Sequence, residues 1–265
     1  MKNLFAFVTL LLCYTSFAQD TSLYLQKAYV NEAGKILPYR ILYPENYDKS
    51  KKYPLLLFLH GAGERGNDNT AQLIHGSRLF LADSNRKKFA CFVVLPQCPK
   101  ESYWSSAKID RSTSPITISF DYEAASITWP LQSSIDLLKQ LAKDEKIDKS
   151  RIYITGLSMG GMGTFEAVYR NPGLFAAALP ICGGGDTMHY DSRVKDIPFW
   201  VFHGDADGTV KVDLSRTMVA KLKVSGVNVK YSEYAGVNHN SWDNAFAEPE
   251  YLSWMFKQKR KKVKW

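Results

Sequence analysis

Ile152-Tyr153-Ile154-Thr155-Gly156-Leu157-Ser158-Met159-Gly160-Gly161 is the stretch on which the interpretation of this sequence depends. Its first residues are apolar or β-branched and predict a buried strand, and the residues from 159 to 169 predict a helix. Between them stands a Gly-x-Ser-x-Gly motif, in which Ser158 occupies a sharp turn from strand to helix. The flanking glycines let strand and helix pack closely, and the turn exposes the serine hydroxyl. A glycine-rich turn with an idle serine also fits these residues, so the rest of the chain must decide.

Strand and helix signals alternate on both sides of this motif. The run at 55–59 is almost continuously apolar, which is typical of a strand buried on both faces of a parallel sheet. Pro130 stands at a plausible first turn of a helix, ahead of apolar residues at helical spacing. Such alternation predicts an α/β fold with a mostly parallel central sheet and helices on both faces. The predicted strands are 24–30 (at an edge), 36–43, 55–59, 92–95, 151–155, 176–181, 199–202 and 229–234, and further helices are predicted around 131–142, 214–222 and 252–256.

The domain organisation is expected to be simple. No linker, repeat or low-complexity segment interrupts residues 19–265, which are expected to form a single domain. The segment at about 101–129 has no clear periodicity and is expected to be an insertion. Long irregular insertions in compact domains are more often functional than accidental. Trp104 and Trp129 in this segment, and Trp242 nearer the C-terminus, are expected to contact the substrate, although such aromatic side chains can also simply pack a loop.

A serine hydroxyl is a weak nucleophile without a neighbouring base. In folds with this turn the base is a histidine, and the supporting acid lies between the serine and the histidine along the chain. His239 follows the last predicted strand in a polar loop, where that base should be. Asp207, at the apex of the loop 203–210, is the expected acid. Asp205 is expected to cap a helix or stabilise the turn. Asp186 remains an alternative acid, because some proteins with this turn place the acid one strand earlier.

An oxyanion that develops on the substrate needs backbone N–H donors. Met159 N–H, at a helix N-terminus, is one expected donor. The loop 60–66, with the sequence His-Gly-Ala-Gly-Glu-Arg-Gly, is expected to supply Ala62 N–H as the other, although a plain glycine turn has the same composition. His60 and His203 each end a strand before a glycine and are expected to shape turns through local hydrogen bonds.

These motifs, together with Pro96-Gln97-Cys98-Pro99, the sequence His-Gly-Asp-Ala-Asp at 203–207 and His-Asn-Ser-Trp at 239–242, resemble those of the α/β-hydrolase esterases. Over about residues 35–256 the chain is similar to secreted bacterial carboxylesterases of the "predicted peptidase" or phospholipase/carboxylesterase type. Feruloyl and acetyl-xylan esterases of carbohydrate esterase family 1, and polyhydroxybutyrate depolymerases, are relatives of that group. The resemblance implies a sheet of about eight strands and ester hydrolysis through an acyl-enzyme, without a metal or organic cofactor. It specifies mechanism better than substrate.

The substrate is expected to be an acyl ester of a carbohydrate, because export suits a polymeric substrate. A serine peptidase of the prolyl-oligopeptidase type is the first alternative, although such peptidases usually carry a gating propeller for which this chain has no room. A lipase or phospholipase is the next, although the segment 101–129 looks too polar for an apolar lid. A polyester depolymerase would need a binding domain that is not found. A non-catalytic binding protein conflicts with the intact serine, aspartate and histidine set.

The N-terminal residues predict export. Lys2, the apolar run 4–12 and Ser16-Phe17-Ala18 have the pattern of a signal peptide, residues 1–18, cleaved after Ala18. The protein is therefore expected in the periplasm or outside the cell. The apolar run is too short to span a bilayer, and no later stretch is long enough.

The formal charge of +8 lies mostly at the C-terminus, where six basic residues fall between 257 and 264. Together with Lys2 they account for seven of the 34 Lys and Arg, so the 26 acidic residues nearly balance the remainder. A solvated basic tail is therefore expected, and nucleic acid is not expected as a partner.

Three cysteines remain after the predicted cleavage. Along a straight strand Cys91 and Cys98 would lie about 20 Å apart, too far for a disulfide. A bridge between Cys98 and Cys182 is conceivable because both follow strands, but all three thiols are expected to be unpaired.

Overall fold

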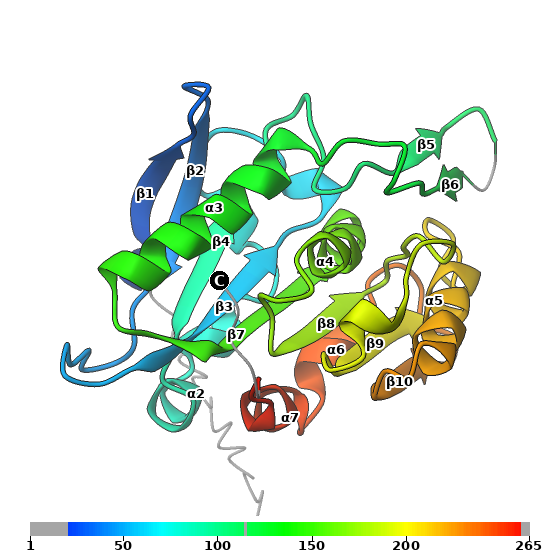
Figure 1. The fold of residues 1–265 in the computed structure, drawn as a ribbon. Coiled ribbons are helices and arrows are strands. Elements are labelled where there is room, and N and C mark those ends of the chain that lie inside the picture. The colour runs from blue at the N-terminus through cyan, green and yellow to red at the C-terminus, as the bar shows by residue number, and fades with distance from the viewer. Residues whose placement is uncertain (1–20, 114–115, 261–265) are drawn as a thin grey trace, which may run out of the picture.

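A computed structural model describes residues 21–113 and 116–260. The central sheet has eight strands, all at the predicted positions: β1 (Leu25–Val30), β2 (Ile36–Leu42), β3 (Tyr53–Leu59), β4 (Phe92–Pro96), β7 (Ile147–Leu157), β8 (Ala177–Ile181), β9 (Phe199–Gly204) and β10 (Val229–Tyr234). Their order across the sheet is β1-β2-β4-β3-β7-β8-β9-β10 (Figure 1). β1 pairs with β2, and β2 with β4, in antiparallel fashion, whereas the six strands from β4 to β10 are parallel. The predicted mostly parallel sheet is confirmed.

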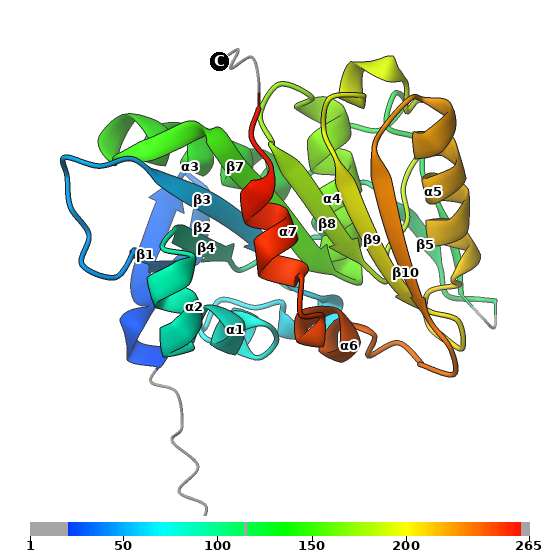
Figure 2. The same cartoon turned by 90° about the horizontal axis from the view of Figure 1, so that it is seen from below.

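Helices cover both faces of the sheet, as predicted (Figures 1 and 2). One face carries α3 (Trp129–Asp144), α4 (Met159–Arg170) and α5 (Asp213–Val224). The other face carries α1 (Ser77–Leu81), α2 (Asp83–Lys88), α6 (Trp242–Ala247) and α7 (Tyr251–Lys257). The short helices α1, α2 and α6 were not predicted, because five or six residues are too few for a helical period to stand out. The described part of the chain also contains 3-10 turns, namely η1 (Thr21–Leu23), η2 (Ala62–Glu64), η3 (Ala71–Leu73) and η4 (Ser192–Val194).

The core has two halves, one on each side of the sheet. In β3, Leu55, Leu57 and Leu59 pack with the helices α3, α4 and α5, whereas Leu56 and Phe58 pack with the helices of the opposite face. Successive strand residues point to opposite faces, so a strand covered on both sides must be apolar at every position. Each fully buried leucine contributes about 1.5–3 kcal/mol relative to an exposed one.

The segment after β4 contains an unpredicted hairpin. β5 (Lys108–Asp110) and β6 (Thr117–Ser119) pair with each other in antiparallel fashion and join no other sheet. Figure 1 shows that this hairpin projects beyond the body of the domain. Residues 105–113 and 116–122 are called the arm below. Strands of three residues are too short to show an alternating pattern, which is why the sequence suggested an aperiodic segment.

The two ends of the chain bear on the export prediction. The predicted signal peptide, residues 1–18, lies outside the described residues, as does the last part of the basic tail. Within residues 21–113 and 116–260, no helix is long and apolar enough to cross a membrane.

Candidate active site

The predicted turn from strand to helix is present at Ser158. β7 ends at Leu157 and α4 begins at Met159, which leaves Ser158 between them with φ 54° and ψ −115°. A positive φ is unfavourable for a residue with a side chain, and such strain concentrates at active sites. The peptide is held by hydrogen bonds from Ser158 N to Ile181 O (2.9 Å) and from Met162 N to Ser158 O (3.0 Å).

The glycines around this turn are required by close backbone contacts. A Cβ atom on Gly160 would overlap the Leu59 carbonyl on the neighbouring strand, and one on Gly161 would overlap the Ile181 carbonyl. The helix α4 therefore approaches the sheet more closely than any larger residue would permit. This approach places the N-terminus of α4, and Ser158 with it, at the carboxyl edge of the sheet.

His239 and Asp207 complete a hydrogen-bonded row with the serine. His239 Nε2 lies 2.9 Å from Ser158 Oγ, and His239 Nδ1 lies 2.7 Å from Asp207 Oδ2. The three residues follow β7, β9 and β10, whose carboxyl ends meet at one edge of the sheet. A carboxylate at Nδ1 keeps the proton on that nitrogen, so Nε2 is free to accept the serine proton.

Asp207 is held in its ionised form. Its side chain is fully buried, and burial by itself would raise the pKa. The hydrogen bonds from His203, His239 and the Val210 N–H outweigh burial and hold the pKa of Asp207 well below its usual range. Asp207 Oδ1 accepts from the N–H groups of Thr209 and Val210, both at 2.8 Å.

His203 is a supporting residue whose full role the sequence did not reveal. It was expected to make local hydrogen bonds at a turn, and it does, but one of them goes to Asp207. Its Nε2 lies 3.1 Å from Asp207 Oδ2 and 2.9 Å from Val210 O. Both partners are acceptors, so Nε2 must carry a proton. Asp207 thus lies between two histidines, of which His203 is entirely buried and only His239 faces the serine.

The other two acid candidates lie elsewhere. Asp205 is exposed and accepts from Gly236 N at 2.6 Å, which is the turn role expected of it. Asp186 is buried and accepts from Tyr122 N (2.7 Å), while its Oδ2 lies 2.7 Å from His189 Nδ1. Neither carboxylate contacts His239 in the hydrogen-bonded row, so geometry favours Asp207 over both.

A pocket of about 350 Å³ opens over Ser158 and His239. Ala62 and Met159, the expected oxyanion donors, both line it. Most of the other lining side chains were not foreseen from the sequence, because they come from segments far apart in the chain. They are Ile109, Arg111, Ile116 and Ile118 from the arm, Tyr103 just before it, Met162 from α4, Thr209 and Val210 from the loop after β9, Glu64 from η2, His75 from between η3 and α1, and Trp242 from α6.

Of the three tryptophans expected to contact a substrate, only Trp242 reaches this pocket. The expectation for Trp104 is wrong: it is fully buried, its Nε1 donates to His60 O at 3.1 Å, and its Cβ fills the space that Gly163 leaves open on α4. Trp129 does not line this pocket either. Trp129 starts α3 and lines a separate surface hollow with Lys35, away from Ser158.

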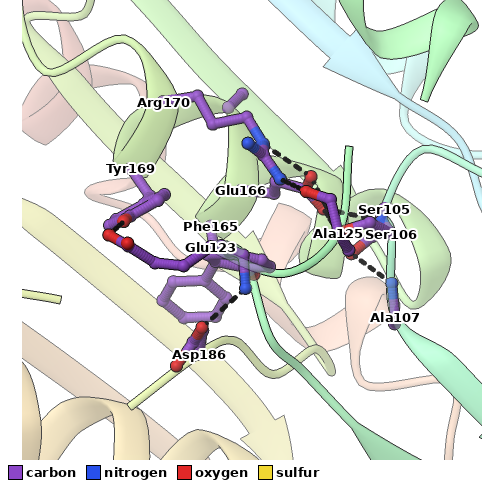
Figure 3. A network of polar contacts seen from close by, with 12 residues as sticks. Ser105, Ser106, Ala107, Glu123, Ala125, Phe165, Glu166, Tyr169, Arg170 and Asp186 are labelled. Atoms are coloured by element: carbon purple, nitrogen blue, oxygen red, sulfur yellow. Dashed lines mark hydrogen bonds and ion pairs between the residues drawn. The ribbon is translucent and has the colours of Figure 1, made fainter. Parts of the chain in front are cut away.

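The arm is fastened to the nucleophile helix by a buried carboxylate (Figure 3). Glu166, fully buried on α4, accepts from Ser105 Oγ (2.8 Å), Ser106 N (2.7 Å) and Arg170 Nε (2.8 Å). Arg170 Nη2 in turn donates to Ala125 O at 2.7 Å. The start of the arm and the chain just after it, at Ala125, are therefore held by one ion pair on the helix that begins after Ser158.

All three cysteines of the described chain are free and buried, as expected. Burial raises the pKa of Cys91 to about 12 and raises those of Cys98 and Cys182 further. Ligand atoms of Cys182, Asp207 and His239 lie within 4.8 Å of one another, as do those of Asp121, Asp186 and His189. The carboxylates of Asp207 and Asp186 already accept hydrogen bonds from backbone and histidine nitrogens.

A serine, a histidine and an aspartate bonded in this way, at the carboxyl edge of a mostly parallel sheet, define the serine hydrolases of the α/β-hydrolase class. The chain belongs to the Phospholipase/Carboxylesterase family, whose profile matches residues 46–250.

Individual relatives include esterases and peptidases. A thermostable esterase of known structure is similar with a TM-score of 0.81 and 40% identity, over 90% of this chain and 64% of that one. A bifunctional acetylxylan esterase/xylanase of Neocallimastix patriciarum is 31% identical over 86 residues, which are 30% of this chain and 13% of that protein. Dipeptidyl peptidase 4 of Sus scrofa is 22% identical over 245 residues, 81% of this chain and 30% of that protein. This chain thus spans only 13% to 30% of the length of the two curated relatives.

Proposed function

We propose that the protein is an exported serine hydrolase that cleaves carboxylic esters through an acyl-enzyme on Ser158. The observation that carries this proposal is the continuous row from Ser158 Oγ through His239 to Asp207, with spacings of 2.9 Å and 2.7 Å. These distances lie within hydrogen-bond reach, which a general base requires. The row opens into the pocket rather than into the core.

The reaction has two halves. Ser158 Oγ attacks the ester carbonyl carbon while its proton passes to His239 Nε2, and Asp207 stabilises the imidazolium. The bond to the leaving alcohol then breaks as His239 returns that proton to the alcohol oxygen. Water attacks the acyl-enzyme with His239 as the base, which releases the acid and restores the serine hydroxyl.

In this proposal the oxyanion of both tetrahedral intermediates binds to Ala62 N–H and Met159 N–H. Ala62 is the first residue of η2 and Met159 is the first residue of α4. The first N–H groups of a helix have no partner within it, and the dipole of α4 favours negative charge at this end. The pocket position of both residues supports the assignment.

The test of the hydrolase proposal is covalent labelling combined with kinetics. A fluorophosphonate should attach to Ser158, and Ser158→Ala should lower kcat on p-nitrophenyl esters by about 10⁴–10⁶-fold. Cys91→Ser, which alters a buried residue outside the pocket, serves as a matched control and should label like the parent. Unchanged esterase activity in Ser158→Ala would contradict the proposal.

The proposed substrate is an acyl ester of a carbohydrate, of the acetyl or feruloyl type. The mostly apolar arm residues suit the acyl group, and Trp242 supplies an aromatic surface in the same pocket. The local similarity to an acetylxylan esterase/xylanase supports a carbohydrate as the alcohol part of the ester. Acetylated and feruloylated xylan should therefore be better substrates than p-nitrophenyl esters of long fatty acids, and the opposite order would favour a lipase.

A peptidase is the second candidate, because the similarity to dipeptidyl peptidase 4 extends over 81% of this chain. The rates on an ester and on an anilide with the same acyl group distinguish an esterase from a peptidase. The ester proposal expects hydrolysis of the p-nitrophenyl ester and little release of p-nitroaniline from an aminoacyl anilide.

Export is proposed from the pattern of residues 1–18. The measurement is N-terminal sequencing of the protein recovered from the periplasm and the medium. A first residue of Gln19 is expected, and intact protein confined to the cytoplasm would contradict the proposal.

A further inference from the structure

Glu64 is a buried carboxylate in the wall of the pocket that the hydrolytic row does not use. Only 8% of the residue is exposed, and its Oε2 has no hydrogen-bond partner among the described residues. Its Oε1 lies 3.7 Å from His75 Nε2, beyond hydrogen-bond distance. A buried carboxylate oxygen without a hydrogen bond costs free energy, so an oxygen of this kind in a pocket wall indicates a task there.

The position of Glu64 does not depend on its carboxylate. Its backbone is held in η2, and its carbonyl oxygen accepts from Gln97 Nε2 at 3.1 Å. The side chain folds back beside Gly61, where a Cβ atom would come within 2.9 Å of Oε2. The carboxylate therefore stands next to the turn that carries Ala62, the proposed oxyanion donor.

Glu64, His75, Trp242 and His239 form a continuous row along one side of the pocket. The rings of His75 and Trp242 lie 5.1 Å apart, and those of Trp242 and His239 lie 5.5 Å apart at 83°. His239 is the group that protonates the leaving alcohol, so residues beside it face the alcohol half of the ester. The isoleucines of the arm come from a different segment and are left for the acyl half.

We propose that Glu64, His75 and Trp242 form a binding subsite for a sugar as the leaving alcohol, with Glu64 accepting a hydrogen bond from a ring hydroxyl close to the ester oxygen. This inference rests on the proposed function and identifies the alcohol part of the ester substrate. A sugar ring has an apolar face of C–H groups that packs on the indole, and hydroxyl groups at its edge that donate hydrogen bonds to a carboxylate. A simple alkyl alcohol would leave Glu64 without a partner.

The kinetic test compares two esters with the same acyl group. An acetyl ester of methyl β-xyloside and ethyl acetate give the same acyl-enzyme, so their ratio of kcat/KM reports only on the alcohol. Glu64→Gln should lower that ratio about tenfold, because a hydrogen bond to a neutral amide oxygen is weaker than one to a carboxylate. Glu64→Asp should recover part of the ratio. Glu101→Gln, an exposed carboxylate outside the pocket, is the matched control and should keep the parent ratio.

A second measurement is independent of turnover. Saturation-transfer NMR with methyl β-xyloside should detect binding to Ser158→Ala protein, and the signal should weaken in Ser158→Ala/Glu64→Gln and in Ser158→Ala/Trp242→Ala. A melting temperature of the single variant Glu64→Gln equal to that of the parent shows that its fold is intact.

The outcomes are distinct. Sugar binding that depends on Glu64 supports the subsite even if no ester is cleaved, in which case only the hydrolase proposal fails. An unchanged kinetic ratio and unchanged sugar binding in Glu64→Gln overturn the subsite while hydrolysis stands. If Glu64→Gln instead lowers kcat/KM selectively for an ester with an ammonium group in the alcohol, the subsite binds cations and the sugar assignment is overturned.

Discussion

Replacement of Glu166 by glutamine should destabilise the fold and loosen the arm together. The amide keeps the size of the side chain but loses the charge that pairs with Arg170. Its NH₂ group also cannot accept the hydrogen bonds that the carboxylate receives from Ser105 and Ser106. If the NH₂ group replaced Oε2, it would face the Ser106 N–H, and both groups would be donors.

The size of the effect follows from burial. Removal of one partner of a buried ion pair typically costs about 3–5 kcal/mol, because the other charge is left without compensation. The Arg170 side chain is 20% exposed and keeps its bond to Ala125 O, so the lower end, about 3 kcal/mol, is expected. For a chain of this size about 3 kcal/mol lowers Tm by roughly 6–12 °C.

The assay is thermal unfolding followed by circular dichroism, with kinetics measured well below Tm. The arm carries Ile109, Ile116 and Ile118 in the pocket wall, so kcat/KM for bulky acyl esters should fall more than that for acetate esters. Glu123→Gln is the matched control, because Glu123 is exposed and accepts one bond from Tyr169 OH; its effect should stay within about 0.5 kcal/mol. A Tm for Glu166→Gln within about 1 °C of the parent value would refute the reasoning.

Further predictions concern the acid, its titration, the buried tryptophan and the thiols. Asp207→Asn should lower kcat by about 10⁴-fold because it favours the wrong imidazole tautomer, whereas Asp205→Asn should have a small effect, and the reverse ranking in steady-state kinetics would reassign the acid. The pKa of Asp207 is lowered in the folded protein, so at acid pH the unfolded chain binds one proton more than the folded chain. The free energy of unfolding therefore falls as the pH drops below about 4. In Asp207→Asn the Tm should decrease less steeply with falling pH than it does in the parent. Trp104→Ala should lower stability by about 3–5 kcal/mol and reduce hydrolysis of large and small esters alike, and a loss confined to large esters would restore a role in substrate contact. Cys182, whose pKa is raised by burial, should react with a thiol reagent only after unfolding, and rapid labelling of the native protein would contradict its described position.

The strands and the hydrogen-bonded row were predictable because their signals are local or periodic. Continuous apolar runs such as 55–59 indicate strands buried on both faces, and the glycines around Ser158 indicate a turn that only small residues permit. The order of serine, acid and histidine along the chain then left few candidates. Asp207 could be preferred over Asp205 from its place at the loop apex, and it is Asp207 Oδ2 that lies 2.7 Å from His239 Nδ1.

The lining of the pocket was less predictable, because it depends on contacts between distant segments. Trp104 lies in a segment without periodicity, and its burial is decided by the space above Gly163 on a helix far along the chain. The proximity of Glu64 to His75, and of His75 to Trp242, likewise depends on how η2, the segment before α1 and the start of α6 pack together. Composition gives no signal for contacts between distant segments. A buried carboxylate oxygen without a hydrogen bond, such as Glu64 Oε2, can be recognised only once the chain is folded.

The position of β10 has a consequence for inactivation by heat. It is the last strand of the sheet, pairs with β9 alone and contains no fully buried residue, yet the loop that follows it carries His239. Edge elements with few buried contacts open at a lower free energy than the central strands. Separation of β10 would remove the base from the serine while β3, β7 and β8 remain folded. Hydrolysis should therefore cease at a lower temperature than the loss of helical signal, and should return on cooling from that interval. The amide groups of β10 should also exchange with solvent deuterium before those of β7.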